Sequence, residues 1–378
     1  MNKKILIAGV IALAVLASSM AIISEADGSV SDEMANTDVA SIGDVGYPTL
    51  ESAVEVIENG TIKLEKDVTC ASTISLNGGK TITIDLNGHT ISAASRVFDV
   101  QNCNLTLTGN GTIQETQNDG YAPLCLKGSN NSADTNYTVI TVGEGVTLKG
   151  WSGLMISPYE SGSQKVAYGV VVNIFGDIVS PAQESHTAYG SGVYVNGQIQ
   201  HKENCPVITL NSTVSINAKL GIYAAGYADW NIEGASITGH DSGIAIKSGT
   251  LTITGGTIEC TGPNTAPTEG FSNGVNASGA AIQIESNNDY AGDIKIEISG
   301  SSTINSTNGY ALYEYLSNPA TVTKVTGLSI EGGTFTYGEN GFALFSENLA
   351  ESNVGKNFIT GGSFTDLVDA VRYAASGK

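Results

Sequence analysis

Two carboxylates on either side of a glycosidic bond can act as acid and base, so we first ask whether any segment of this chain carries such a pair. The segment TGHDSGIAIKSG, residues 238–249, carries Asp241 next to His240. Ser242 takes the following position, so the second carboxylate that hydrolysis needs is not beside the first. The phrase SGIAI also has several copies elsewhere in the chain, which favours a structural role. We therefore assign no catalytic residue, and Asp241 is the single candidate.

The remaining chemistry-bearing residues do not form a metal or nucleophile pattern. Calcium needs several converging oxygens, and no Asp-x-Asp cluster occurs on the repeated segments. The histidines and arginines lack the spacing of a metal site or a triad: His89, His186, His201, His240, Arg96 and Arg372. The five cysteines match no zinc spacing, and we expect buried free thiols: Cys70, Cys103, Cys125, Cys205 and Cys260. No metal and no cofactor is predicted, and calcium enters only if the chain is a polysaccharide lyase.

A ligand-binding surface is better supported, by aromatic residues at equivalent positions of a repeated strand. In SGVYV, residues 191–195, Val193 and Val195 face inward, so Tyr194 faces outward. The same phase in the other copies gives an outward column of Cys125, Met155, Tyr194, Tyr223, Ala245, Gln283, Tyr313 and Phe345. Aromatic rings on a flat sheet suit stacking against sugars. The predicted ligand-binding residues are Met155, Tyr194, Tyr223, Tyr313, Phe345, Trp151 and Trp230.

The alternative is that long inserts fold over this face and bury the aromatic residues. Those inserts are residues 157–168, 180–190, 198–206 and 260–279. The sequence leaves the two possibilities open.

Internal repeats determine the elements that position these residues. The unit LTITGGTI, residues 251–258, has copies such as ITIDLNGHTI from Ile82 and LSIEGGTF from Leu328. The last strand apolar residue before each Gly-rich corner is Leu86, Leu107, Val142, Ile174, Leu210, Ile232, Ile253, Ile298, Ile330 or Ile359. Alternating apolar residues predict strands, and no helical pattern separates them. Stacking two strand types in parallel predicts an all-β fold, a parallel β-helix solenoid of about ten turns.

The chain ends predict caps. Leu50, Ala53, Val54 and Ile57 share one helical face, and Thr49 can cap that helix. We expect residues 46–60 to cover the first turn, residues 367–376 to cover the last, and residues 46–378 to form one domain. Leu367, Val368, Val371 and Ala374 are the expected covering residues at the C-terminal end.

The N-terminus and the charge indicate an exported protein. Lys3 and Lys4 precede an apolar run, so residues 1–26 predict a signal peptide, cleaved after Ala21 or Ala26 or retained as an anchor. Residues 27–45 are acidic and predict a disordered spacer. The net charge of −20 argues against nucleic acid as a partner. We expect an extracellular or cell-surface location, no membrane span beyond the leader, and a glycan or surface polymer as the partner.

The run GYPTLESAVEVIENGTIKLEKDVTCASTISLNGGKTITIDLNGHTIS, residues 46–92, resembles the N-terminal unit of secreted or surface right-handed parallel β-helix proteins of prokaryotes, in the pectate-lyase-like superfamily. The resemblance covers about residues 46 to 366 and implies that the parallel β-helix is right-handed. TGHDSGIAIKSG resembles a polygalacturonase segment with two neighbouring Asp residues. Asp241 matches the first Asp, Ser242 replaces the second, and that family's other catalytic segments have no counterpart.

From these features the sequence predicts a non-catalytic β-helix protein with a glycan-binding, adhesive or structural role. The alternatives are a polysaccharide lyase or glycoside hydrolase that acts on acidic polysaccharide, and a pure spacer. Two carboxylates about 5 to 10 Å apart on one outward face would favour the enzymes.

Overall fold

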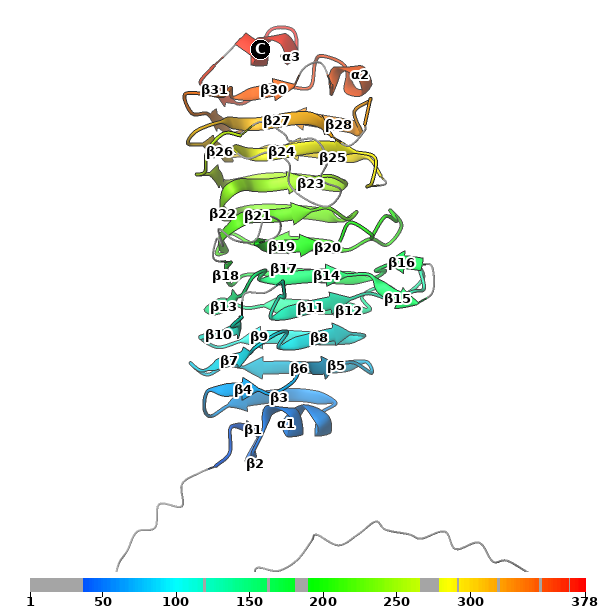
Figure 1. The fold of residues 1–378 in the computed structure, drawn as a ribbon, viewed down its shortest axis with the longest axis vertical. Coiled ribbons are helices and arrows are strands. Elements are labelled where there is room, and N and C mark those ends of the chain that lie inside the picture. The colour runs from blue at the N-terminus through cyan, green and yellow to red at the C-terminus, as the bar shows by residue number, and fades with distance from the viewer. Residues whose placement is uncertain are drawn as a thin grey trace, which may run out of the picture. The chain divides into compact units, whose positions relative to one another are not determined.

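The computed structural model describes residues 37–117, 120–161, 164–180, 190–265, 279–290, 292–317, 320–346, 349–366 and 368–378. The expected signal peptide, and the spacer up to residue 36, lie outside the described residues. The compact unit Asp38–Lys378 is all-β. Its described strands form one sheet of 29 strands, mostly paired in parallel, and a separate two-stranded sheet. Figure 1 shows these strands stacked in layers from α1 to α3.

The parallel strands fall into three series, and within a series each strand pairs with its equivalent in the next repeat. The first series is β3 (Asn59–Leu64), β6 (Lys80–Asp85), β9 (Cys103–Thr108), β12 (Thr138–Val142), β17 (Val170–Ile174), β20 (Val207–Leu210), the starts of β22 (Asp229–Ile246) and β23 (Gly249–Cys260), β25 (Ile294–Ile298) and β28 (Val325–Ile330). Its inward residues are the aliphatic positions that the repeats predict.

The second series follows each Gly-rich corner. It comprises β4 (Val68–Cys70), β7 (Thr90–Ala93), β10 (Gly111–Glu115), β13 (Val146–Lys149), β18 (Asp177–Val179), the start of β21 (Ser215–Ala224), the middle of β22, the end of β23, β26 (Thr303–Ser306), β29 (Thr334–Thr336) and β31 (Ser363–Phe364). Phe335 and Phe364 stack at its C-terminal end, with ring centroids 4.6 Å apart.

The third series contains the copies of SGVYV. It comprises β5 (Ile74–Leu76), β8 (Phe98–Gln101), β11 (Leu124–Lys127), β14 (Leu154–Ser157), β19 (Ser191–Val195), the ends of β21 and β22, β24 (Ala280–Asn287), β27 (Tyr310–Ser317) and β30 (Leu344–Ser346). The antiparallel pair β15 (Tyr159–Ser161) and β16 (Gln164–Val166) forms the separate sheet.

The register of the first series agrees with the reference residues taken from the repeats, except at the first. The residues from Leu107 to Ile330 pair in succession, and Ile330 forms a bridge with Ile359. Opposite Leu107 lies Ile84, not Leu86, so the expected phase was wrong by two residues there. Both residues are buried, because the two-residue period of the strand puts them on the same side.

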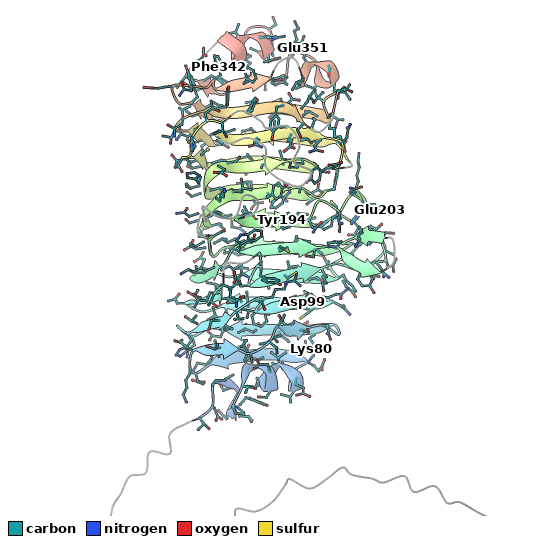
Figure 2. The ribbon with its side chains drawn as sticks, viewed as in Figure 1. Lys80, Asp99, Tyr194, Glu203, Phe342 and Glu351 are labelled. Atoms are coloured by element: carbon teal, nitrogen blue, oxygen red, sulfur yellow. The ribbon has the colours of Figure 1, made fainter. Side chains whose placement is uncertain are left out.

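At the N-terminal end, part of the segment that was expected to be a disordered spacer forms strands. Strands β1 (Ala40–Ile42) and β2 (Val45–Tyr47) pair with each other, and β1 also pairs with β3. Ordered structure therefore begins inside the segment 27–45. Helix α1 (Leu50–Val56) follows as expected, and the Ser52 N–H donates to the Thr49 hydroxyl at 3.0 Å. Lys80, labelled in Figure 2, donates to the carbonyls of Val54 and Ile57 at 2.9 Å and so satisfies the helix end.

At the other end, α2 (Glu351–Val354) follows β30, and α3 (Val368–Tyr373) follows the last strand, β31. The expectation that Val371 covers the core is wrong, since its side chain is 64% exposed. Ala370 and Tyr373 are buried instead, and the Tyr373 hydroxyl donates to the Ser346 carbonyl at 2.7 Å. Three-residue spacing on a short helix puts these two residues on one face.

The glycine of the repeated SGVYV phrase allows adjacent layers to approach closely. Gly221 lies between Gly192 and Gly243 of the neighbouring layers. A Cβ at Gly221 would stand 2.3 Å from the Gly243 carbonyl oxygen and 2.3 Å from Cγ2 of Ile237. Both distances are far inside van der Waals contact, so this position excludes a side chain.

We expect Gly221→Ala to lower the free energy of unfolding by roughly 1–3 kcal/mol, because backbone and core must move apart to admit the methyl group. Urea unfolding measures this change. Gly255→Ala is the matched control, because a Cβ there meets no atom nearer than 3.7 Å. The control should be neutral or slightly stabilising. Equal unfolding midpoints for the two variants would show that the layers are not in close contact at Gly221.

Candidate functional site

The eight residues of the predicted column are aligned in the structure. Successive strand pairings align Cys125 with Met155, then Tyr194, Tyr223, Ala245, Gln283, Tyr313 and Phe345. The rings of Tyr194 and Tyr223 stack with centroids 5.4 Å apart, and those of Tyr313 and Phe345 are also 5.4 Å apart. Parallel pairing places equivalent side chains one strand spacing apart, which brings these rings into contact.

The column is not evenly exposed. Met155 and Tyr223 are buried, whereas Tyr194, Tyr313 and Phe345 are half-buried. Tyr223 packs with Leu220, Ala245 and Tyr290, so part of the column forms a second apolar cluster. Of the expected inserts, residues 181–189 and 266–278 lie outside the described residues. The described part of the chain therefore offers Tyr194, Tyr313 and Phe345, not the whole column, to a ligand.

Besides Met155 and Tyr223, two further predicted ligand-binding residues are corrected by the structure. Trp230 is 1% exposed and lies in the first series between Ile208 and Leu251, facing the core. It precedes the inward residue Ile232 by two positions, so the strand period puts both on the same side. Trp151 is also buried, and its carbonyl accepts a hydrogen bond from the Ser180 hydroxyl at 2.5 Å. Neither indole is placed to stack on a sugar.

A pocket of about 390 Å³ opens beside Tyr194. It is lined by Tyr194, Asn196, Gly197, Gln198, Gln200, Asp289 and Tyr290. Residues 196–200 follow β19, while Asp289 and Tyr290 belong to the turn after β24. A Cβ at Gly197 would stand 2.2 Å from the Tyr290 ring, so glycine allows the two segments to meet. Figure 2 labels Tyr194 in the middle layers of the stack.

A second pocket, of about 450 Å³, shares Gln198 and Gln200 with the first and is also lined by Lys165, Val166 and His201. The His201 ring is fixed, because Nε2 accepts from the Ala167 N–H at 2.9 Å and Nδ1 donates to the Glu203 carbonyl at 3.0 Å. Burial lowers the pKa of His201 below its usual value of 6.5, which favours this neutral ring. His201 therefore forms a fixed part of the second pocket's wall, between β16 and the segment 198–200.

Two lysines hold the turn that carries Asp289 and Tyr290. The Lys324 ammonium donates to the main-chain carbonyls of Asn287 and Tyr290. The Lys247 ammonium lies 5.0 Å from the centroid of the Tyr290 ring and forms an ion pair with Glu285. Sequence reasoning missed these two lysines, because their partners lie more than thirty residues away along the chain.

A separate aromatic cluster lies at the C-terminal end of the same column. Tyr310 contacts Tyr313, Phe342 and Phe345, with centroids 4.6, 6.3 and 5.4 Å away, respectively. Tyr337 adjoins Phe342 at 6.5 Å. Phe342 is the exposed member of the cluster and is labelled in Figure 2. Tyr310 and Phe342 were not predicted, because neither occupies the column position of its repeat.

Asp241 lines neither pocket. Its carboxylate is 2.7 Å from Nδ1 of His240 and 3.6 Å from the Lys219 ammonium. Among the described residues, no group of three or more His, Cys, Asp and Glu side chains is placed to hold a metal ion. All five cysteines are buried free thiols, as predicted. Burial raises the pKa of Cys70 and of Cys205 to about 12, which makes both thiols poor nucleophiles.

The chain matches no protein-family model, no curated protein and no solved structure. In the part of the chain that the structure describes, no helix is long and apolar enough to cross a bilayer.

Glu314, which follows Tyr313 in β27, is a buried carboxylate whose titration should affect the stability of the fold. It accepts from the Thr323 hydroxyl at 2.5 Å, the Ser346 hydroxyl at 2.7 Å and the Ala350 N–H at 2.8 Å. Burial raises its pKa above the usual 4.5, although the hydrogen bonds oppose the shift. The folded protein therefore binds this proton more tightly than the unfolded chain does.

It follows that the contribution of Glu314 to the free energy of unfolding is greatest below pH 4.5 and is lost as the pH rises through the raised pKa. Glu314→Gln should remove that loss, because the amide stays neutral and Thr323 can accept its N–H. Denaturant unfolding from about pH 4 to pH 7 should then show the variant gaining on the wild type, by about 1.4 kcal/mol per unit of pKa shift. Glu297→Gln, at an exposed site, is the control. Parallel stability curves for Glu314→Gln and the wild type would contradict the assignment.

Proposed function

We propose that this chain is an exported, right-handed parallel β-helix of about ten turns that binds glycans on one outward face without cleaving them. The three series of parallel pairings support the helix, because each series advances by one strand per repeat. The resemblance in residues 46–92 supports the right-handed form, and the N-terminal leader pattern supports export. The role is adhesive or structural, at the cell surface or outside the cell.

The observation that carries the binding proposal is the pocket at Tyr194. The Tyr194 ring stacks on Tyr223 and is half-buried, and its exposed part offers apolar C–H surface to the C–H groups of a sugar. Around it, Asn196, Gln198 and Gln200 offer amides, each with both donors and acceptors. Sugar hydroxyls also donate and accept, so this combination of ring and amides fits a glycan better than an apolar or strongly charged ligand.

The same pocket favours binding over hydrolysis. Acid–base cleavage of a glycosidic bond needs two carboxylates across the scissile bond. Among the described lining residues, Asp289 is the one carboxylate, while Glu285 nearby is paired with Lys247. The lyase or hydrolase alternative would need a further acidic or basic group brought to this pocket.

A glycan array combined with a panel of soluble polysaccharides tests the proposal. The full-length exported protein should be retained by at least one glycan, and the same glycan should keep its chain length after long incubation. Release of shortened or unsaturated products would replace the proposal by the enzymatic alternative. Absence of both retention and turnover across the panel would favour the pure spacer.

A further inference from the structure

Three polar side chains are completely enclosed beside the pocket. Lys247, Glu285 and Asn287 have relative exposures of 0%, 1% and 0%, respectively. Ile246 pairs with Ile284, so Lys247 and Glu285 follow side by side in adjacent layers, and Asn287 lies two residues further on the same face. A buried ion pair often stabilises a fold no better than apolar residues would. Stability alone is therefore a weak reason for this group.

The two carboxylate oxygens of Glu285 accept hydrogen bonds from the Lys247 side chain and from the Asn287 carboxamide, respectively. Oε2 accepts from the Lys247 ammonium, and Oε1 accepts from Nδ2 of Asn287 at 3.0 Å. The carbonyl oxygen of Asn287 accepts from the Asp289 N–H at 2.9 Å. A hydrogen bond to that oxygen draws electron density from Cγ, the atom that a nucleophile attacks. One carboxylate thus connects a nucleophile to a polarised electrophile.

We propose that Lys247 and Asn287 join in an intramolecular amide cross-link, with Glu285 transferring the protons. A bond forms between Nζ of Lys247 and Cγ of Asn287, and the Cγ–Nδ2 bond of Asn287 breaks. Two of the three ammonium protons of Lys247 pass through the Glu285 carboxylate to the departing nitrogen, which leaves as an ammonium ion. Glu285 ends as the carboxylate it was at the start, and no oxidant or co-reactant is consumed.

The surroundings favour this chemistry. Burial lowers the pKa of Lys247 below its usual 10.5, although Glu285 opposes the shift, so a neutral nucleophilic amine is more accessible than in water. The Lys247 ammonium lies between the rings of Tyr290 and Tyr223, 5.0 and 5.7 Å from their centroids. The Tyr315 hydroxyl donates to Glu285 Oε2 at 3.0 Å and fixes the carboxylate. The enclosure also excludes the water that would hydrolyse an activated amide.

Peptide mass spectrometry on the folded, full-length protein tests the cross-link. Loss of ammonia lowers the mass by about 17 Da, whereas an amide between Lys247 and Glu285 would lose water, about 18 Da. Trypsin should fail to cut after Lys247, because an acylated lysine is not its substrate. Cleavage after glutamate should release one branched species, in which peptide 234–259 is joined to peptide 286–297. Fragment ions should place the branch at Lys247 and Asn287.

Lys247→Arg is the matched control, because arginine keeps the positive charge but cannot form the link. The two peptides should then separate, and the loss of about 17 Da should disappear, whereas a succinimide at some asparagine would give the same loss and persist. Glu285→Gln should also leave peptide 234–259 unlinked, and the peptide that carries Asn287 then becomes 270–297, because the variant lacks the cleavage site at residue 285. Should either variant fail to fold, the wild-type digest alone decides. Free peptides 234–259 and 286–297 of unmodified mass from the folded wild type would overturn the proposal, and a loss of water would overturn the assignment to Asn287.

Discussion

Trp230→Ala is expected to lower the free energy of unfolding by about 3–5 kcal/mol, the usual cost of truncating a buried aromatic residue. The indole is 1% exposed and lies between Ile208 and Leu251 in the first series of strands. Removing it leaves a cavity between two neighbouring layers, which cannot close up without breaking the ladder. Urea unfolding followed by circular dichroism measures the change.

Trp230→Phe is the control for this prediction. In the described part of the chain, the indole N–H of Trp230 has no hydrogen-bond partner, so phenylalanine removes a donor whose burial is costly. We expect a much smaller loss of stability than for alanine. Glycan retention per folded molecule should be unchanged in both variants. A stable Trp230→Ala protein that no longer binds glycan would restore Trp230 as a ligand-binding residue and contradict its place in the core.

Tyr194→Ala is expected to weaken glycan retention by roughly tenfold or more, because truncating a central aromatic contact commonly costs about 1–3 kcal/mol of binding free energy. Tyr194 is the column residue that lines the pocket with the amides of Asn196, Gln198 and Gln200. Its ring is half-buried and stacks on Tyr223, so the fold should survive the change. Surface plasmon resonance with the retained glycan measures the loss.

Two variants separate stacking from general effects. Tyr194→Phe keeps the ring and should retain most of the affinity. Tyr121→Ala removes a tyrosine that is exposed but does not line the pocket, and it should bind like the wild type. Equal affinity of Tyr194→Ala and the wild type would exclude the pocket at Tyr194 as the binding site. The aromatic cluster around Phe342 would then be the next site to test.

The strand period and the repeated phrase predicted which residues of the site are aligned. The two-residue period of the strands and the repeated phrase SGVYV were sufficient to align Cys125 through Phe345, and every member of that column pairs as expected. The same period, applied from Ile232, would have placed Trp230 inside.

The pocket itself could not have been predicted from the repeats. It forms where the segment after β19 meets the turn after β24, and Gly197 allows that contact by leaving room for Tyr290. Tyr223 and Tyr290, which pack together beneath it, are 67 residues apart. Contacts at that separation depend on how insert lengths bring different layers together, which a local pattern does not contain.

By itself, the sequence determined the all-β character, the parallel register, the inward aliphatic rows and the helix that begins after Thr49, because strand period, corner glycines and capping are local properties. Only the tertiary structure decided which outward residues are exposed. It also showed that the strands begin before residue 45, and that Lys247, Glu285 and Asn287 share one enclosed site. Burial and charge pairing arise from residues distant in the chain, and their energies exist only once the layers are packed.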